Sequence, residues 1–300
     1  MHFCTAFLIM YFYIMKHIIA TARIIFIYAL CYACSPSTST QSESLNDTTA
    51  VSTENSRETD VQDTTKFKFD FAIANIPSPA QVLMQMHSKN TISNDLLLKT
   101  DLVEKFNNEF VKSLAMGVYN IDFAYSIQTN QSQNVLNYMK AIAAMSMNLG
   151  LKNALDQILG QRVEQNLSQK DSLFSILDDV FYKSDAFLKT NKRMKVASLI
   201  FTGSWIETLY LNGIGGQQAN DEASKLYAKT LLWQQRFHLE NLIRLLNDFK
   251  SDPQVAALCT DLNSILVQIQ AEKQAENIQD KRFAELIQAI SNVRAKLFKV

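Results

Sequence analysis

Two acidic residues stand inside apolar stretches of the sequence, where carboxylates are unusual. Asp122 lies in the run 117–125 (Gly-Val-Tyr-Asn-Ile-Asp-Phe-Ala-Tyr), and Glu207 lies in the run 203–210 (Gly-Ser-Trp-Ile-Glu-Thr-Leu-Tyr). A buried carboxylate costs several kcal/mol unless a cation or a hydrogen-bond donor partners it. We therefore expect each carboxylate to have a partner among the following nearby polar side chains: Tyr119, Tyr125, Tyr210, Arg193 and Lys195.

These two carboxylates allow three interpretations. In the first, Asp122 and Glu207 fix the register of packed helices and have no other role. In the second, they belong to a small-ligand pocket whose walls are the aromatic residues Tyr119, Tyr125, Trp205 and Tyr210. In the third, they are an acid–base pair of an enzyme. We favour the structural role, because paired carboxylates alone specify little chemistry.

The sequence holds no other pattern that indicates catalysis. His87 and His238 have neither the spacing of a zinc site nor the Glu-x-x-His context of a di-iron bundle. The glycine-rich run 213–216 follows an apolar helix, so we expect it to end that helix and not to bind phosphate. Cys259 lies in an apolar run and is expected to be a buried core residue. We predict no metal, no cofactor and no enzymatic activity.

The N-terminus has the features of a bacterial signal peptide. The apolar runs 3–15 and 24–33 are each too short to cross a bilayer, and Lys16 and Arg23 separate them. The second run suits a signal-peptide core, with Met15 as the true start. Ala33 before Cys34 resembles the lipobox of lipoproteins, although residues 31 and 32 depart from its usual pattern. A plain secretory signal and a retained anchor are the alternatives.

The segment that follows is a polar tether. Residues 35–66 contain 15 Ser or Thr, six acids and two bases, which is too little apolar surface to offset the entropy of ordering the chain. The motifs at Thr48 and Thr64 resemble the Asp-Thr-Thr type of O-glycosylation site used by Bacteroidetes. We therefore expect residues 1–33 to be a signal segment, and residues 34–66 to be a tether on a fatty-acylated Cys34.

Residues 67–300 are expected to form one all-α domain, an irregular multi-helix bundle. The whole chain has only 7 Gly and 4 Pro, which disfavours turn-rich β folds. Apolar residues recur at spacings of three and four, which is typical of helices. We predict helices over about 79–86, 102–126, 132–149, 153–166, 171–190, 193–211 and 221–250, followed by two more with stripes over 258–269 and 283–297.

Three details of this prediction concern the core. The helix 193–211 is apolar on nearly every face and should lie at the centre. Gly117 allows either a close helix contact or a kink. Leu226, Trp233 and Phe237 share one stripe, which we expect to be buried.

Several of these stretches carry a family resemblance. The segments 76–79 (Ile-Pro-Ser-Pro), 117–125, 171–173 (Asp-Ser-Leu) and 203–210 resemble a family of uncharacterised Bacteroidetes envelope lipoproteins. That family has a Pro-Ser-Pro helix start, a Gly-x-Tyr-x-x-Asp-x-x-Tyr helix and a Gly-x-Trp-x-Glu helix. The resemblance implies an envelope address and a helical fold, and it implies no activity.

The charge balance and the address together define the functional hypothesis. Lysine plus arginine equals aspartate plus glutamate, 29 each, so no basic field favours nucleic acid. We predict a non-enzymatic outer-membrane lipoprotein. Many surface-exposed lipoproteins of Bacteroidetes carry acidic residues directly after the lipidated cysteine, whereas the first acid after Cys34 is Glu43, so we expect this protein to face the periplasm. Its partners are the membrane, through the lipid, and another envelope protein. The alternatives are a ligand pocket near Asp122, Trp205 and Glu207, or an unrecognised carboxylate enzyme.

Overall fold

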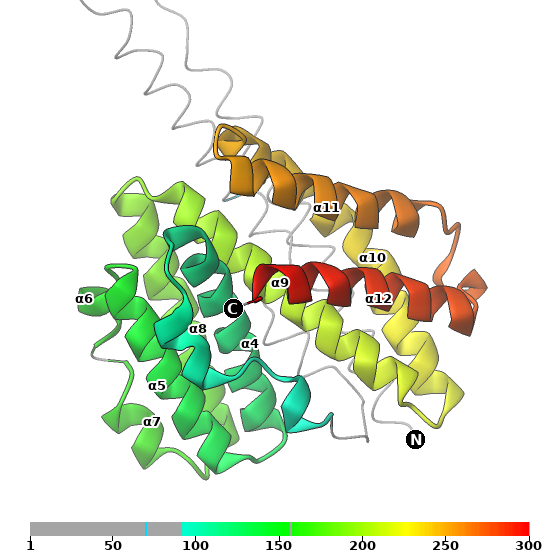
Figure 1. The fold of residues 1–300 in the computed structure, drawn as a ribbon. Coiled ribbons are helices and arrows are strands. Elements are labelled where there is room, and N and C mark those ends of the chain that lie inside the picture. The colour runs from blue at the N-terminus through cyan, green and yellow to red at the C-terminus, as the bar shows by residue number, and fades with distance from the viewer. Residues whose placement is uncertain (1–69, 71–91, 157, 300) are drawn as a thin grey trace, which may run out of the picture. The chain divides into compact units, whose positions relative to one another are not determined.

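The computed structural model describes Asp70 and residues 92–156 and 158–299. The expected signal segment, Cys34, the tether with Thr48 and Thr64, His87 and the helix 79–86 lie outside the described residues. Within the described part, every regular element is a helix, and the prediction of an all-α multi-helix bundle is confirmed (Figure 1).

The central helix of the bundle is α9 (Met194–Gln217), which packs against α4, α8, α10 and α12. In Figure 1, α4, α5 and α8 lie on one side of α9, and α10, α11 and α12 lie on the other. The remaining elements are η1 (Asn94–Leu96), η2 (Thr100–Lys105), α4 (Glu109–Gln128), α5 (Ser132–Asn148), α6 (Lys152–Leu155), α7 (Gln161–Gln165), α8 (Lys170–Thr190), α10 (Glu222–Leu246), η3 (Asn247–Phe249), α11 (Pro253–Gln270), η4 (Ala275–Asn277) and α12 (Asp280–Leu297).

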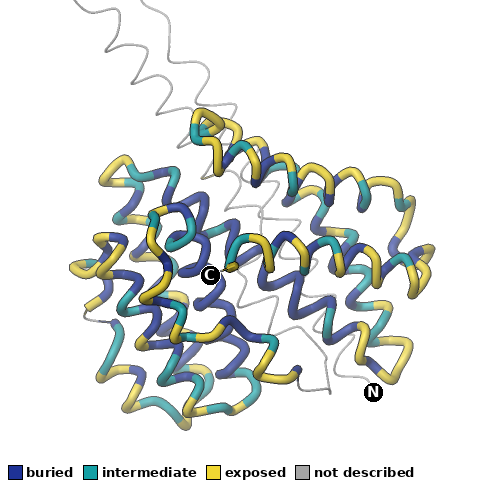
Figure 2. Tube along the Cα trace, in the orientation of Figure 1, coloured by how far each residue is buried: buried dark blue, intermediate teal, exposed yellow. Residues whose placement is uncertain are grey.

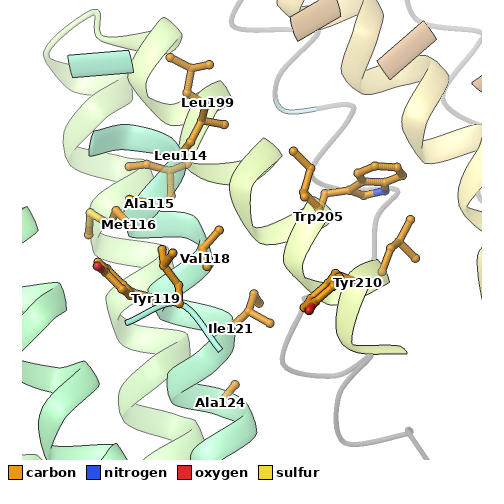
Figure 3. Close-up of a cluster of buried hydrophobic side chains, with 14 of the residues drawn as sticks. Leu114, Ala115, Met116, Val118, Tyr119, Ile121, Ala124, Leu199, Trp205 and Tyr210 are labelled. Carbon is orange, nitrogen blue, oxygen red and sulfur yellow. The ribbon is translucent and has the colours of Figure 1, made fainter. Parts of the chain in front are cut away.

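The backbones of α4 and α9 touch through a reciprocal pair of glycines. A Cβ atom at Gly117 would lie 2.0 Å from the carbonyl oxygen of Ile200, and one at Gly203 would lie 2.0 Å from that of Leu114. The Ser204 hydroxyl also donates a hydrogen bond to the Gly117 carbonyl oxygen, at 3.1 Å. The two runs that carry Asp122 and Glu207 therefore lie side by side (Figure 3). Gly117 allows a close contact between the two helices.

The prediction that the glycine run 213–216 ends the central helix is wrong. Helix α9 continues through this run to Gln217. A Cβ atom at Gly213 would lie 2.3 Å from Cδ1 of Ile287 in α12, and one at Gly216 would lie 2.4 Å from Cβ of Ala228 in α10. These glycines allow two neighbouring helices to approach α9 closely.

Two predicted helices are each divided in the structure. The predicted helix 102–126 begins only at Glu109, because the Asn108 side chain caps it by accepting a hydrogen bond from the Val111 N–H at 2.9 Å, and residues 100–105 form η2 instead. The predicted helix 153–166 is interrupted at Gly160, whose φ of 82° lies in the left-handed region that favours glycine.

The predicted burial of the stripe on α10 is wrong for Leu226 and Phe237, whereas Trp233 is partly buried against the core. Figure 2 shows the burial along each helix in the orientation of Figure 1. Leu226 is 43% exposed and Phe237 is 58% exposed, whereas Ala228, Leu232 and Leu239 face the core. Helix α10 therefore has two apolar faces. The second is packed only in part, through Trp233, which contacts the core and donates a hydrogen bond from Nε1 to the Glu272 carbonyl oxygen at 2.9 Å.

Elsewhere the predicted helices agree with the structure to within a few residues. Helices α5, α8, α11 and α12 bury most of their predicted stripes, and Cys259 is buried as expected. Within residues 92–156 and 158–299, no helix combines the length and the apolar character needed to cross a bilayer.

Candidate functional site

The contact between α4 and α9 brings the two carboxylates together in the core. Asp122 and Glu207 are both 0% exposed, and they are close enough for the charge of Glu207 to raise the pKa of Asp122. The two residues are 85 positions apart in the sequence and meet because Gly117 and Gly203 let the helices touch. We call Asp122, Glu207 and their cation, Arg294, the polar cluster.

Arg294 reaches the cluster from α12. Its Nη2 donates a hydrogen bond to Oε1 of Glu207 at 2.8 Å, and its Nε donates to Oε2 of the same carboxylate. The guanidinium carbon lies 4.3 Å from the centroid of the Tyr210 ring. Burial disfavours the charged guanidinium, but the Glu207 carboxylate outweighs it and raises the pKa of Arg294 above its usual range. This bidentate pair attaches α12 to α9.

Asp122 is the less satisfied of the two carboxyl groups. Its Oδ2 accepts a hydrogen bond from the Leu98 N–H at 2.9 Å. Among the described residues, no N–H or O–H group donates to its Oδ1. Burial, followed by the charge of Glu207, raises the pKa of Asp122 well above its ordinary value, although Arg294 and the Leu98 N–H oppose that shift.

Tyrosines from α4 and α5 hold the chain segment 92–99 over this cluster. The hydroxyl of Tyr138 donates to the Leu98 carbonyl oxygen at 3.1 Å, and that of Tyr119 donates to the Lys99 carbonyl oxygen at 3.0 Å. Tyr125 accepts a hydrogen bond from the Ile92 N–H at 2.6 Å. Burial raises the pKa of Tyr119 and of Tyr138, so both keep their hydroxyl protons into the alkaline range.

The six residues of the predicted polar group do not all meet. Asp122, Glu207 and Tyr210 come together around Arg294, whereas Tyr119 and Tyr125 bind residues 92–99. Trp205 leaves α9 on the side away from Tyr119 (Figure 3), and its Nε1 donates to Oε1 of Gln235 in α10 at 3.1 Å.

The expected partners of the carboxylates are wrong: in the described structure none of the five forms a hydrogen bond or ion pair with Asp122 or Glu207. Tyr119 and Tyr125 bind residues 92–99, and Tyr210 lies against Arg294. Arg193 pairs with Glu109 at 2.7 Å, and Lys195 pairs with Asp252 at 3.1 Å.

Three participants were missed at the level of sequence: Arg294, Tyr138 and the Leu98 amide. The position of Arg294 in the sequence does indicate that it is buried. It lies four residues after Ile290 and seven after Ile287, on the stripe that α12 buries. A cation on a core stripe predicts a buried anion opposite to it. The Leu98 amide carries no such signal, because any residue offers a backbone N–H.

The geometry of the cluster limits its chemistry. A general acid or base must reach a substrate atom directly or through a water molecule, and both carboxylates are fully enclosed. A cavity of about 190 Å³ lies near the C-terminal end of α4, with Ser126, Ser168 and Lys170 in its lining, and none of the six candidate residues lines it. Among the described residues, no group of three or more His, Cys, Asp or Glu side chains could hold a metal ion.

In comparisons with known proteins, no family model, no curated protein and no solved structure matches this chain.

Proposed function

We propose that this chain is a non-enzymatic lipoprotein of the bacterial envelope, whose helical domain binds or scaffolds another envelope component. The observation that carries the proposal is the complete burial of Asp122 and Glu207, which are the main candidates for catalytic or ligand-binding residues. Both oxygens of Glu207 accept hydrogen bonds from Arg294, and Oδ2 of Asp122 accepts one from the Leu98 N–H. Such an arrangement supports a structural role for the pair over catalysis or ligand binding.

A binding module needs an accessible surface, and the second apolar face of α10 offers one. Leu226 and Phe237 are exposed on it and Trp233 is half-buried. The guanidinium carbon of Arg236 lies 3.4 Å from the Trp233 ring centroid and 3.9 Å from that of Phe237. Aromatic residues and arginine are enriched at the centres of protein interfaces. We call Leu226, Trp233, Arg236 and Phe237 the α10 outer face.

The address of the domain rests on the N-terminal sequence. Ala33 and Cys34 match the end of a lipoprotein signal, and residues 34–66 have the composition of a flexible tether. A coil of that length reaches roughly 30 Å on average. The lipid would place the domain at the outer membrane, facing the periplasm, within reach of other envelope proteins.

The binding proposal is tested by photo-crosslinking in intact cells. A photoreactive phenylalanine analogue replaces Phe237 in one strain and Tyr182 of α8 in another, because Tyr182 is 74% exposed and lies on a different helix. We expect a discrete adduct with an envelope protein from position 237 and none from position 182. Equal labelling from both positions, or no adduct from position 237, contradicts a specific partner at the α10 outer face.

The address is tested separately by intact-protein mass spectrometry of the native product. We expect a mature chain that begins at Cys34 and carries acyl mass on that residue. A chain that keeps residues 1–33, or one that lacks acyl mass, contradicts the lipoprotein assignment and leaves the test of partner binding intact.

A further inference from the structure

Among the described residues, one carboxyl group attaches the segment 92–99 to the bundle, that of Asp122, which accepts a hydrogen bond from the Leu98 N–H. The hydroxyls of Tyr119, Tyr125 and Tyr138 supply the other side-chain hydrogen bonds from the bundle to the backbone of the segment. Ile92, Leu97 and Leu98 are buried there. The protonation state of Asp122 therefore affects both the core and the segment 92–99 that covers it.

The charges and hydrogen bonds around Asp122 require a proton. The polar cluster holds two carboxyl groups and one guanidinium, and both oxygens of Glu207 already accept hydrogen bonds from Arg294. The Oδ1 atom of Asp122 is buried and has no donor among the described residues, and the charge of Glu207 acts on this carboxyl group. A proton on Oδ1 turns this unsatisfied acceptor into a donor and removes the surplus negative charge.

We infer that Asp122 carries a proton on Oδ1, donates it in a hydrogen bond to Glu207, and acts as a pH-sensitive latch for residues 92–99. Loss of this proton to water as the pH rises leaves two buried anions and a single cation. Opening of the segment relieves the repulsion, because it gives the Asp122 carboxylate access to water. The latch is closed in the protonated state and weakened in the ionised state.

The other titratable groups around Asp122 do not account for such a switch. Tyr119 on α4 and Tyr138 on α5 keep their hydroxyl protons because their pKa values are raised. Tyr210 on α9 also has a raised pKa, and Arg294 on α12 stays charged. Asp101, close to the segment, acts electrostatically on Tyr119. On α8, which also packs on α4, Asp179 pairs with Arg162 and Asp185 pairs with Lys189.

The sign of the pH dependence follows from the raised pKa of Asp122. Between the ordinary carboxyl pKa of 3.8 and the higher folded value, the folded chain binds more protons than the unfolded chain. The contribution of Asp122 to stability therefore falls as the pH rises through this window and is constant above it. Below the window, both states are protonated and the contribution does not depend on pH.

The first test needs no variant. In the full chain with ¹³C-labelled aspartate, the Cγ resonance of Asp122 is followed by NMR from acidic to alkaline pH. We expect the change from a protonated carboxyl group to a carboxylate to occur at a clearly higher pH for Asp122 than for the exposed aspartates of the same chain. A change in the same pH range as the exposed aspartates overturns the inference.

The second test uses Asp122→Asn, which reproduces the protonated group. Its Oδ1 can accept from the Leu98 N–H and its Nδ2 can donate to Glu207, but it cannot ionise. Hydrogen exchange of the Leu98 amide is measured against that of Leu262, in α11, after correction for the intrinsic effect of pH. In the wild type we expect protection of Leu98 to fall by up to about tenfold for each pH unit between pH 3.8 and the folded pKa of Asp122, and to become constant above that pKa, because the open state binds fewer protons than the closed state only inside this window. Leu262 should stay better protected than Leu98 throughout, because its exchange requires a larger opening of the bundle. In Asp122→Asn we expect constant protection of both.

The outcomes separate the latch from an ordinary buried carboxylate. Parallel pH profiles for the wild type and Asp122→Asn overturn the inference, because the proton would then reside elsewhere. Failure of Asp122→Asn to fold also counts against it, since the amide keeps both hydrogen bonds of the protonated acid. Glu109→Gln, a change in a half-exposed carboxylate that pairs with Arg193, controls for removal of an acid and should retain the wild-type slope.

Discussion

The polar cluster and the α10 outer face both reverse the usual distribution of side chains. The cluster places Asp122, Glu207 and Arg294 in the core, whereas the outer face leaves Leu226 and Phe237 exposed. The buried charges are compensated within the described structure by ion pairing, a backbone hydrogen bond and, as we infer, a shared proton. The exposed apolar residues have no comparable cover among the described residues, except for the stacking of Arg236.

The difference indicates how the molecule uses each region. A compensated polar group in a core fixes which helices meet and in what register, so its removal lowers the free energy of unfolding. Substitutions on an uncovered apolar face change the free energy of unfolding little, so their main effect is on binding to a partner. Variants in the cluster should therefore affect unfolding, and variants on the α10 outer face should affect binding.

The largest effect is expected for Arg294→Met. The change leaves Glu207 buried without its cation, which costs about 3–5 kcal/mol of the free energy of unfolding. Denaturant titration of the full chain measures it. Arg244→Met is the matched control, because Arg244 forms a surface pair with Glu240 and its side chain is 68% exposed. That control should cost less than about 1 kcal/mol.

A double variant shows whether the loss comes from the stranded carboxylate. Replacing both partners, in Glu207→Leu/Arg294→Met, removes the buried anion along with the cation and should recover a large part of the stability. A double variant no more stable than Arg294→Met alone would show that the pair itself, and not the unpaired charge, is responsible.

The next effect in size is expected for Gly203→Ala. The added Cβ atom would meet the Leu114 carbonyl oxygen at 2.0 Å, and a backbone atom in a packed helix cannot move aside without separating α4 from α9. Overpacking of this kind costs about 3 kcal/mol. Gly213→Ala is the comparison, because the nearest atoms to its Cβ atom would belong to the Ile287 side chain, which can shift at a lower cost than the backbone of a packed helix. Equal losses in thermal or denaturant unfolding would contradict the backbone argument.

The sequence predicted the type of most helices but not which helices meet. The stripes of α11 and α12 have one apolar face each, so periodicity located their buried residues correctly. Helix α10 has two apolar faces, and the choice between them depends on its neighbours. The glycines at positions 213 and 216 resemble a helix end in sequence, although they mark close contacts within α9.

The same limit applies to the polar cluster. Asp122 and Glu207 stood out because each interrupts an apolar run, which is a local feature. Their cation lies 87 residues beyond Glu207. The place of Arg294 on the apolar stripe of α12 indicates that it is buried, but nothing in the sequence indicates that it faces Glu207. Sequence periodicity reports the face of a residue on its own helix, whereas an ion pair between helices depends on tertiary packing.

The smallest effect on stability is expected for Phe237→Ala on the α10 outer face. Because the Phe237 side chain is 58% exposed, its removal should change the free energy of unfolding by no more than about 0.5 kcal/mol. Leu239→Ala, two residues further along the same helix, is the control. Leu239 is fully buried, and its truncation should cost about 2–5 kcal/mol. A loss for Phe237→Ala as large as that for Leu239→Ala would mean that the outer face is already packed in the folded chain. The α10 outer face would then belong to the core, and the contrast between a compensated interior and an open surface would fail at that helix.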